Sequence, residues 1–335
     1  MVRAPQTVIE QAVEILRSGG VVAFPTETVY GLGANASDPA AVRRIFELKG
    51  RPADHPVIVH LDDPRYLHRW VRDIPPCAKL LADEFWPGPL TLIYPRAENV
   101  SDLVTGGQDS IGIRVPSHPL AQQLLNAFGG GLAAPSANRF GRLSPTRPEH
   151  VREEFGDEVD LILDGGESLI GLESTIVSCL DNKPVLLRPG FITQSQLTAV
   201  VGPVELRADS SSLNQSLPRA PGDRTHHYAP LTPLELVPID ELERRAGEFA
   251  DRSEKIAVLA MRPPLHTRRY MTWVNAGRKA DTYAHNLYNH LRRLDRAGCV
   301  RILVQEVPDD ERWAAVRDRL WRASGGRDSL EISAA

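Results

Sequence analysis

The sequence GVVAFPTETVYGLG, residues 20–33, combines a strand with a loop that carries polar side chains. Val21–Phe24 is a short apolar run with two β-branched residues, which is typical of a buried strand. Pro25 has no backbone N–H, so we expect it to end the regular pairing of that strand. Thr26–Gly33 then places two hydroxyls, a carboxylate and a phenol past the carboxyl end of the strand. Small ligands usually bind at that edge of an open α/β sheet, so the stretch predicts either a binding loop or an ordinary polar turn.

Three later segments repeat this arrangement of a strand followed by hydroxyl, basic or glycine residues. One strand ends at Arg114, one precedes the loop 135–146, and one ends at Arg188 before Pro-Gly. Along 110–116 apolar residues alternate with small or polar ones, which places Arg114 on the strand face opposite Ile111, Ile113 and Val115. Helices and strands intermix without strict βαβ repetition. The predicted fold is therefore α/β, with a twisted mixed open sheet and helices packed against it.

The regular pattern fades between residues 202 and 232, where serines and prolines cluster. Strands and helices then alternate cleanly, which predicts a smaller, Rossmann-like α/β domain. That domain has neither GxGxxG nor GxxxxGK[ST], so its sequence shows no sign of nucleotide binding. His226-His227-Tyr228 makes the connecting segment more aromatic than an inert spacer, and we hypothesise that it folds over a ligand as a lid. The predicted organisation is a catalytic domain over 1–203, a linker and lid over 204–232, and a small domain over 233–335.

Composition describes an ordinary globular protein, with 42% hydrophobic and 24% charged residues among 335. A net charge of -4 argues against a general polyanion binder, although a local basic cleft remains compatible with it. The three cysteines form no CxxC pair, so neither a thiolate metal site nor a disulfide framework is expected. The amino-terminal segment carries acidic residues, unlike a signal or transit peptide, and no apolar run would span a bilayer. We expect a cytoplasmic protein with no membrane association.

The candidate site residues are mostly cations and neutral hydrogen-bond donors. Cations suit a polyphosphate, and the arginine fork fits phosphate or carboxylate oxygens. Hydroxyl and amide groups beside a glycine suit a phosphate or ribose. The cations are Lys49, Arg51, Arg114 and Arg188, and the neutral groups are Thr28, Ser136, Asn138, Ser144 and Ser174.

Each of these residues also has a purely structural interpretation. Lys49 and Arg51 could only stabilise a helix carboxyl end, and His60 could be a hydrogen-bonded structural histidine. The sequence shows no Ser-His-Asp triad, nucleophile elbow or zinc signature. Positioning and charge neutralisation are therefore favoured over covalent or metallohydrolase catalysis.

A series of short motifs resembles, in order, the YrdC-like family, the threonylcarbamoyl-AMP synthases. The resemblance covers roughly residues 7–203. The motifs are PTETVYGLG at 25–33, KGRP at 49–52, FWPGPLT at 85–91, IGIRVP at 111–116, APSAN at 134–138, SPT at 144–146, GLESTIV at 171–177 and LRPG at 187–190. PGDRTHHYAP at 221–230, followed by a small α/β domain, is similar to the long, two-domain form of the family.

The resemblance implies an enzyme, a nucleotidyltransferase that makes threonylcarbamoyl-AMP and pyrophosphate from L-threonine, bicarbonate and ATP. Mg²⁺ would bridge phosphate oxygens of the ATP, because it rarely has an all-protein cage. A separate tRNA threonylcarbamoyl transferase complex would then pass the group to an adenosine beside the anticodon. A weak RNA contact would be compatible with this role.

The family's site residues transfer to matching positions of this sequence. The threonine site would consist of Thr28, His60, Arg114, Ala134 and Ser174. The ATP site would consist of Arg51, His55, Ser110, Ser136, Ser144, Arg188 and Tyr228. The charged catalytic pair at the phosphates would be Lys49 and Arg51, and no side chain is assigned to a metal. His55 stands where the family often has Asn, and the middle of the linker motif also departs from the family pattern.

Two other functions share features with this sequence. An RNA-binding or ribosome-associated module would use the same basic concavity, but the chain has an acidic balance and lacks an aromatic stacking platform. A hydrogenase-maturation carbamoyltransferase shares the YrdC-like domain. It would also need zinc-finger segments, which three isolated cysteines cannot build.

Overall fold

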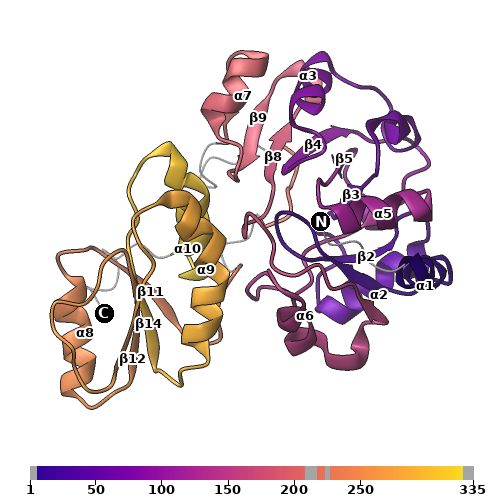
Figure 1. The fold of residues 1–335 in the computed structure, drawn as a ribbon. Helices are drawn as coiled ribbons and strands as arrows, with labels where there is room; N and C mark the ends of the chain where they lie inside the picture. Colours follow the sequence, from indigo (N-terminus) through magenta and orange to yellow (C-terminus); the bar gives the residue numbers. More distant parts are fainter. Residues whose placement is uncertain (1–5, 208–216, 223–226, 327–335) are drawn as a thin grey trace. The chain divides into compact units, whose positions relative to one another are not determined.

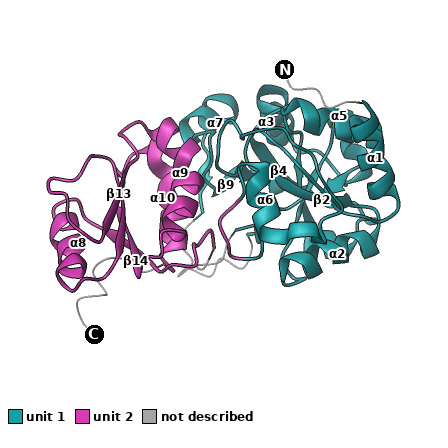
Figure 2. Ribbon diagram, turned by 60° about the horizontal axis from the view of Figure 1, so that its bottom comes forward, with its two compact units in different colours: residues 1–140, 145–223 teal, residues 141–144, 224–335 magenta. Residues whose placement is uncertain are grey.

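The computed structural model describes residues 6–207, 217–222 and 227–326. The chain forms two compact units, coloured separately in Figure 2: residues 1–140 with 145–223, and residues 141–144 with 224–335. Each unit has its own sheet (Figure 1). Much of the predicted lid, including His226, lies outside the described residues.

The first unit contains a ten-stranded mixed sheet in the order β10-β9-β8-β4-β5-β3-β6-β2-β1-β7. Parallel pairs such as β3 with β5 adjoin antiparallel pairs such as β4 with β5. This arrangement confirms the predicted twisted, mixed α/β sheet. The strands are β1 (Val22–Phe24), β2 (Gly31–Asn35), β3 (Ile58–His60), β4 (Leu90–Pro95), β5 (Ser110–Arg114), β6 (Leu132–Ala133), β7 (Leu161–Ile162), β8 (Thr175–Ser178), β9 (Val185–Arg188) and β10 (Glu205–Leu206).

Seven α-helices belong to the described part of this unit, and amphipathic spacing explains how they pack. In α1, Ile9, Ala12, Val13 and Leu16 recur at three- and four-residue intervals and are buried together. The helices are α1 (Gln6–Arg17), α2 (Pro39–Lys49), α3 (Pro76–Phe85), α4 (Asp102–Thr105), α5 (Pro119–Phe128), α6 (Pro148–Phe155) and α7 (Gln194–Val201), with 3₁₀ turns η1 (Pro64–Arg69), η2 (Gly156–Glu158) and η3 (Leu180–Asn182).

The two faces of this sheet are covered differently. The larger core cluster packs α2, α3, α4, α6 and α7 against one face. On the other face, α1 and α5 cover only the end formed by β1, β6 and β7. On that second face the central strands carry a small cluster of apolar side chains, which includes Ile58, Ile93, Ile176 and Leu187. Among the described residues of this unit, no helix packs on the central strands over this second face.

The chain resumes pairing sooner after β1 than the sequence predicted. The expected loop to Gly33 was wrong in its last residues, because β2 begins at Gly31 and runs antiparallel to β1. The ring of Phe24 explains why residues 31 and 33 of β2 are glycines. A Cβ at Gly31 would lie 3.3 Å from that ring, and a Cβ at Gly33 would lie 2.7 Å from it. Glycine at these two positions lets the second strand pass directly over the aromatic side chain.

The second unit contains a parallel four-stranded sheet in the order β11-β14-β12-β13, which confirms the predicted small α/β domain. Strand β13 was not predicted from the sequence. Its side chains are mostly half-buried and show no clear alternation. The elements are β11 (Leu234–Val237), α8 (Leu242–Asp251), β12 (Ile256–Ala260), β13 (Met271–Asn275), α9 (Ala280–Asp295), β14 (Arg301–Gln305), η4 (Glu311–Trp313) and α10 (Ala314–Ala323).

A short excursion of the chain, residues 141–144, belongs to this second unit. Its Arg142 forms a parallel bridge with Ala229, and the Ala229 N–H donates to the Gly141 carbonyl at 2.9 Å. Arg292 of α9 donates to the Leu143 carbonyl at 2.6 Å. The loop that follows β6 therefore contributes residues 141–144 to the second unit, while the residues on both sides of them belong to the first.

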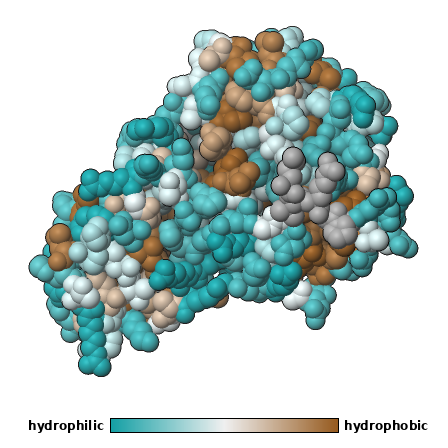
Figure 3. Space-filling view, in the orientation of Figure 1, coloured by the Kyte–Doolittle hydropathy of each residue, from teal (hydrophilic) through white to brown (hydrophobic). Residues whose placement is uncertain are grey.

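The surface in Figure 3 is largely hydrophilic, and its apolar residues lie in separate patches. Scattered apolar residues are normal on globular proteins and call for no partner. In the described part of the chain, no helix is both long enough and apolar enough to cross a bilayer.

Candidate active site

The residues predicted to bind threonine gather where several strands of the first sheet end. His60 is the last residue of β3 and Arg114 the last of β5, and the two are direct partners in the parallel register. Ile111 and Ile113 point into the core, so Arg114 lies on the opposite face, as predicted. Because both strands run in the same direction, their carboxyl ends present the imidazole and the guanidinium side by side.

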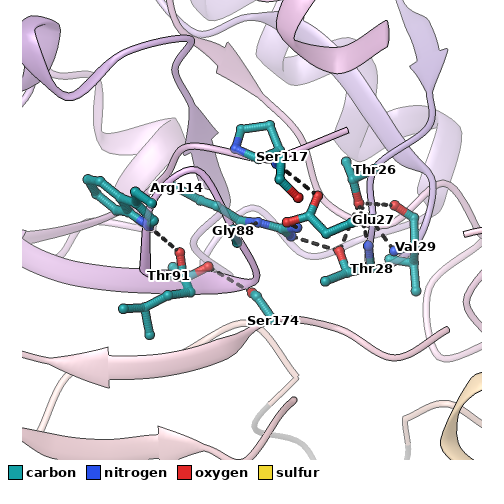
Figure 4. Close-up of polar contacts among 12 residues, drawn as sticks. Thr26, Glu27, Thr28, Val29, Gly88, Thr91, Arg114, Ser117 and Ser174 are labelled. Atoms are coloured by element: carbon teal, nitrogen blue, oxygen red, sulfur yellow. Dashed lines mark hydrogen bonds and ion pairs between the residues drawn. The ribbon is translucent and has the colours of Figure 1, made fainter. Parts of the chain in front are cut away.

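Arg114 is held from three sides, as Figure 4 shows. Its Nη1 donates to the Thr28 hydroxyl at 2.8 Å, and its Nε donates to the Gly88 carbonyl at 3.3 Å. Its Nη2 lies 2.7 Å from Oε1 of Glu27. Thr28 comes from the loop after β1, so the opening stretch of the sequence does reach the site. The arginine is almost entirely buried and has a fixed orientation.

Ser174, just before β8, forms a second polar group near this edge. Its hydroxyl lies 2.8 Å from that of Thr91 on β4 (Figure 4). Arg188, the last residue of β9, donates through Nη2 to both the Ser174 carbonyl at 3.0 Å and its hydroxyl at 3.1 Å. Its Nη1 donates to the Pro221 carbonyl at 2.9 Å. Arg188 thus fixes the backbone that carries Ser174 as well as offering charge to the site.

His60 is buried, and its Nδ1 has no hydrogen-bond partner in the described part of the chain. Burial and, after it, the nearby positive charge of Arg114 together lower the pKa of His60 to about 3. The imidazole is therefore neutral at ordinary pH and can both accept and donate a hydrogen bond. Ala134, just after β6, donates its backbone N–H to the carbonyl of Ile58, two residues before His60 on β3, at 2.9 Å.

The sequence places Lys49 at a helix carboxyl end, where a cation is usually exposed to solvent, but the structure buries its side chain. It is the last residue of α2, which ends where Gly50 takes a left-handed conformation. Its ammonium donates to the Ser136 carbonyl at 2.6 Å and also to the Asn138 carbonyl. Burial, followed by the charge of Arg51, lowers the pKa of Lys49. Lys49 therefore holds the loop that carries Ser136.

Arg51, His55 and Ser110 lie toward the other end of β3 and β5. Arg51 is buried and donates to the Pro56 carbonyl at 2.8 Å, just before β3. The His55 ring packs edge-on against Phe140 at 5.4 Å. Ser110 opens β5 on the same face as Arg114, four residues away, which corresponds to ~13 Å along an extended strand. A ligand lying along β5 would therefore span the distance between a phosphate region and the Arg114 region.

Two of the predicted nucleotide-binding residues, Ser144 and Tyr228, belong to the second unit. Tyr228 has a positive φ of 59°, which is uncommon for a bulky residue and often marks a functional position. Its ring lies 4.2 Å from that of His227 and 6.2 Å from that of Tyr288. The guanidinium of Arg319 lies 5.2 Å above it. Helices α9 and α10 thus hold Tyr228 in an unusual backbone conformation.

Sequence reasoning assigned no role to Glu27 or Thr91, although both are buried at the site. Glu27 lies in the opening stretch, and a carboxylate between two threonines just past a strand was a usable signal. Thr91 could be found only through its contact with Ser174, because the two residues are 83 positions apart. Among the described residues, no three His, Cys, Asp or Glu side chains gather as a metal site.

Comparisons with known proteins cover both units. A family model of Sua5, YciO and YrdC proteins, described as telomere recombination, matches residues 14–190. A second model, the C-terminal domain of threonylcarbamoyl-AMP synthase, matches residues 192–325.

Two threonylcarbamoyl-AMP synthases are similar to nearly the whole chain. The Bacillus subtilis protein is 42% identical over 95% of this chain and 93% of its own length. The Pyrococcus abyssi protein is 40% identical over 95% of this chain and 94% of its own length.

A crystal structure of P. abyssi Sua5 complexed with L-threonine is similar in fold. It superposes with a TM-score of 0.89 and 38% identity, and covers 97% of this chain and 96% of that one. The sequence motifs and the mixed fold agree with these matches. The chain therefore belongs to the Sua5/YciO/YrdC family, in the threonylcarbamoyl-AMP synthase group that carries the C-terminal domain.

Proposed function

We propose that this threonylcarbamoyl-AMP synthase uses L-threonine, bicarbonate and ATP, and that the Arg114 region holds the amino acid. The observation that carries the proposal is a set of buried polar groups at one sheet edge that retain unused hydrogen-bonding capacity. Nδ1 of His60 has no hydrogen-bond partner in the described part of the chain, and Nη2 of Arg114 meets Oε1 of Glu27 at 2.7 Å in an ion pair that is not aligned as a hydrogen bond. Buried polar atoms without partners are rare, and a ligand that supplies the partners explains them.

In this proposal each group of the threonine region matches a group of the amino acid. Arg114 binds the carboxylate through a charge-assisted hydrogen bond. The neutral imidazole of His60 serves the side-chain hydroxyl, because it can donate or accept without adding charge. Thr28 and Ser174 would complete the polar wall, and the small side chain of Ala134 would face the methyl group of threonine.

ATP would lie along the same face, between Arg188 beside Ser174 and Arg51 near the amino end of β3. Arg51 and Arg188 would neutralise phosphate charge, and Ser110 and Ser136 would donate to oxygens. Lys49 would act on the phosphates mainly by shaping the loop that it holds. The remaining proposed contacts are His55, Ser144 and Tyr228.

The reaction divides into two steps. The threonine amine takes up bicarbonate with loss of water, and the resulting carbamate oxygen attacks the α-phosphorus as pyrophosphate leaves. The protein would contribute by aligning the carbamate with the α-phosphate and by neutralising the charge that develops there. No side chain of the site is needed as a covalent nucleophile.

Mg²⁺ fits this site through the substrate and not through a protein cage. The described residues gather no three carboxylate, histidine or cysteine groups, whereas ATP brings phosphate oxygens that Mg²⁺ prefers. When bound, the ion would supply further charge neutralisation at the triphosphate.

The product would serve tRNA modification in the cytoplasm. An aminoacyl adenylate analogue of this kind is a mixed anhydride that loses its group readily to water, so a transferase complex must take it up soon after release. A weak RNA contact near the site would be compatible with such a transfer.

One experiment tests the proposal. The chain is incubated with L-threonine, ATP, Mg²⁺ and isotopically labelled bicarbonate, and the mixture is analysed for pyrophosphate and a labelled adduct of threonine with AMP. Omission of threonine should abolish both products. Pyrophosphate release without threonine, or an adduct that lacks the bicarbonate label, would overturn the proposed reaction.

A further inference from the structure

Glu27 and Arg114 form a buried ion pair at the floor of the threonine region. Their side chains are only 5% and 4% exposed, and Oε1 of Glu27 lies 2.7 Å from Nη2 of Arg114 (Figure 4). A buried pair of this kind has lost its hydration, so its charges act strongly on any ligand that enters. Because the two charges cancel, the pair itself carries no net charge.

The pair leaves one donor and one acceptor unused. Nη2 of Arg114 and Oε1 of Glu27 touch but are not aligned as a hydrogen bond, and neither has another partner in the described part of the chain. The rest of both groups is occupied. Nε and Nη1 of Arg114 donate to Gly88 and Thr28, and Oε2 of Glu27 accepts from the Ser117 N–H at 3.2 Å. A positive donor and a negative acceptor thus lie side by side without hydrogen bonds.

This arrangement discriminates between ligands by charge. A carboxylate that reaches Arg114 also comes close to Glu27, and two neighbouring carboxylates repel each other in a buried site. The repulsion disappears if the ligand carries its own positive charge on the adjacent atom. An α-amino acid does so, because one carbon bears both its carboxylate and its ammonium.

We propose that Glu27 and Arg114 together recognise the zwitterion of the amino acid: Arg114 binds the carboxylate and Glu27 binds the ammonium. The inference rests on the proposed function, since it takes the Arg114 region as the threonine site. It makes Glu27 a specificity-determining residue that rejects hydroxy acids. If Glu27 served only to hold Arg114 in place, it would not affect a ligand that has an ammonium but no carboxylate.

Three probes separate these two roles. L-Threonine carries both charges, (R)-3-hydroxybutyrate is threonine without its amine, and L-threoninol is threonine without its carboxylate. Binding of each is measured by calorimetry on the full chain, directly or in competition, for the wild type and for Glu27→Gln. We expect the variant to bind threonine and threoninol about 10-fold or more weakly, as for the loss of a charged hydrogen bond. We expect its affinity for 3-hydroxybutyrate to be unchanged or higher, because the repelling carboxylate is gone.

Controls keep the result specific. Glu158→Gln removes a surface ion pair with Arg139, whose partners are 44% and 49% exposed, and should change none of the three affinities. ATP binding and thermal unfolding show whether each variant is folded. If Glu27→Gln fails to fold, Glu27→Asp replaces it. The shorter carboxylate keeps the charge, so this variant should prefer threonine to 3-hydroxybutyrate while binding both ammonium ligands more weakly.

Two outcomes would overturn the inference. Equal losses for threonine and 3-hydroxybutyrate with unchanged threoninol binding would make Glu27 only a support for Arg114. The inference would also be overturned if the wild type binds threonine but its preference for threonine over 3-hydroxybutyrate is no larger than that of Glu27→Gln. By contrast, a folded wild type that binds no threonine would overturn the proposed function itself.

Discussion

His60 gives a quantitative prediction for the stability of the first unit at acid pH. Its folded-state pKa is about 3, against an ordinary value of 6.5, because burial and then Arg114 oppose its protonation. As the pH falls below 6.5, the unfolded chain takes up a proton at this position while the folded chain does not. The folded state therefore loses stability progressively from pH 6.5 down to about pH 3.

The expected loss follows from linkage. Protonation of His60 in the unfolded chain lowers the free energy of unfolding by about 2 kcal/mol at pH 5. At pH 7 the same contribution is close to zero. His60→Gln removes this titration while keeping a polar side chain. Urea unfolding of the wild type and the variant at pH 7 and at pH 5 gives four free energies. The drop between the two pH values should be about 2 kcal/mol larger for the wild type.

Other titrating groups do not obscure this difference. Burial also lowers the pKa of His118 and of His290, but both residues are present in the two proteins, so their contributions cancel. Equal drops in the wild type and in His60→Gln would refute the reasoning. In that case the His60 imidazole would be able to hold a proton in the folded protein.

Three further predictions concern ligand binding, a buried cation and a tight backbone contact. Arg114→Leu removes one charged hydrogen bond to the threonine carboxylate, so it should weaken threonine binding by roughly 10-fold or more and leave ATP binding nearly intact. Separate calorimetric titrations with each ligand check this, and equal losses of affinity for both ligands would indicate a structural arginine. Lys49→Met should lower both turnover and stability, the latter by about 1–3 kcal/mol in urea unfolding, because two loop carbonyls lose their donor; an unchanged unfolding curve would contradict this. Gly190→Ala should destabilise the fold more than Gly50→Ala in thermal unfolding. The Cβ at 190 would lie 2.3 Å from the Thr175 nitrogen, whereas a Cβ at 50 would meet nothing within 4 Å and would add only the strain of a left-handed backbone. Similar melting temperatures would count against this contact.

The sequence alone determined the features that depend on neighbouring residues. The apolar run before Pro25 predicted a buried strand, and alternation along 110–116 placed Arg114 on the face opposite the core. Alternating strands and helices beyond residue 233 predicted the small second domain. Short motifs in a fixed order were enough to indicate the family. These signals are local, because backbone conformation and side-chain direction follow from residues a few positions apart.

Only the tertiary structure decided which of these residues meet. Thr28 and Arg114 are 86 positions apart, and their contact depends on the register of β3 with β5 and on the path of the loop after β1. Lys49 resembled a surface cation in the sequence, yet packing turns it inward onto the Ser136 loop. No sequence pattern indicated the pairing of Glu27 with Arg114 either. Such contacts are long-range, and chain topology, which no local pattern encodes, brings them together.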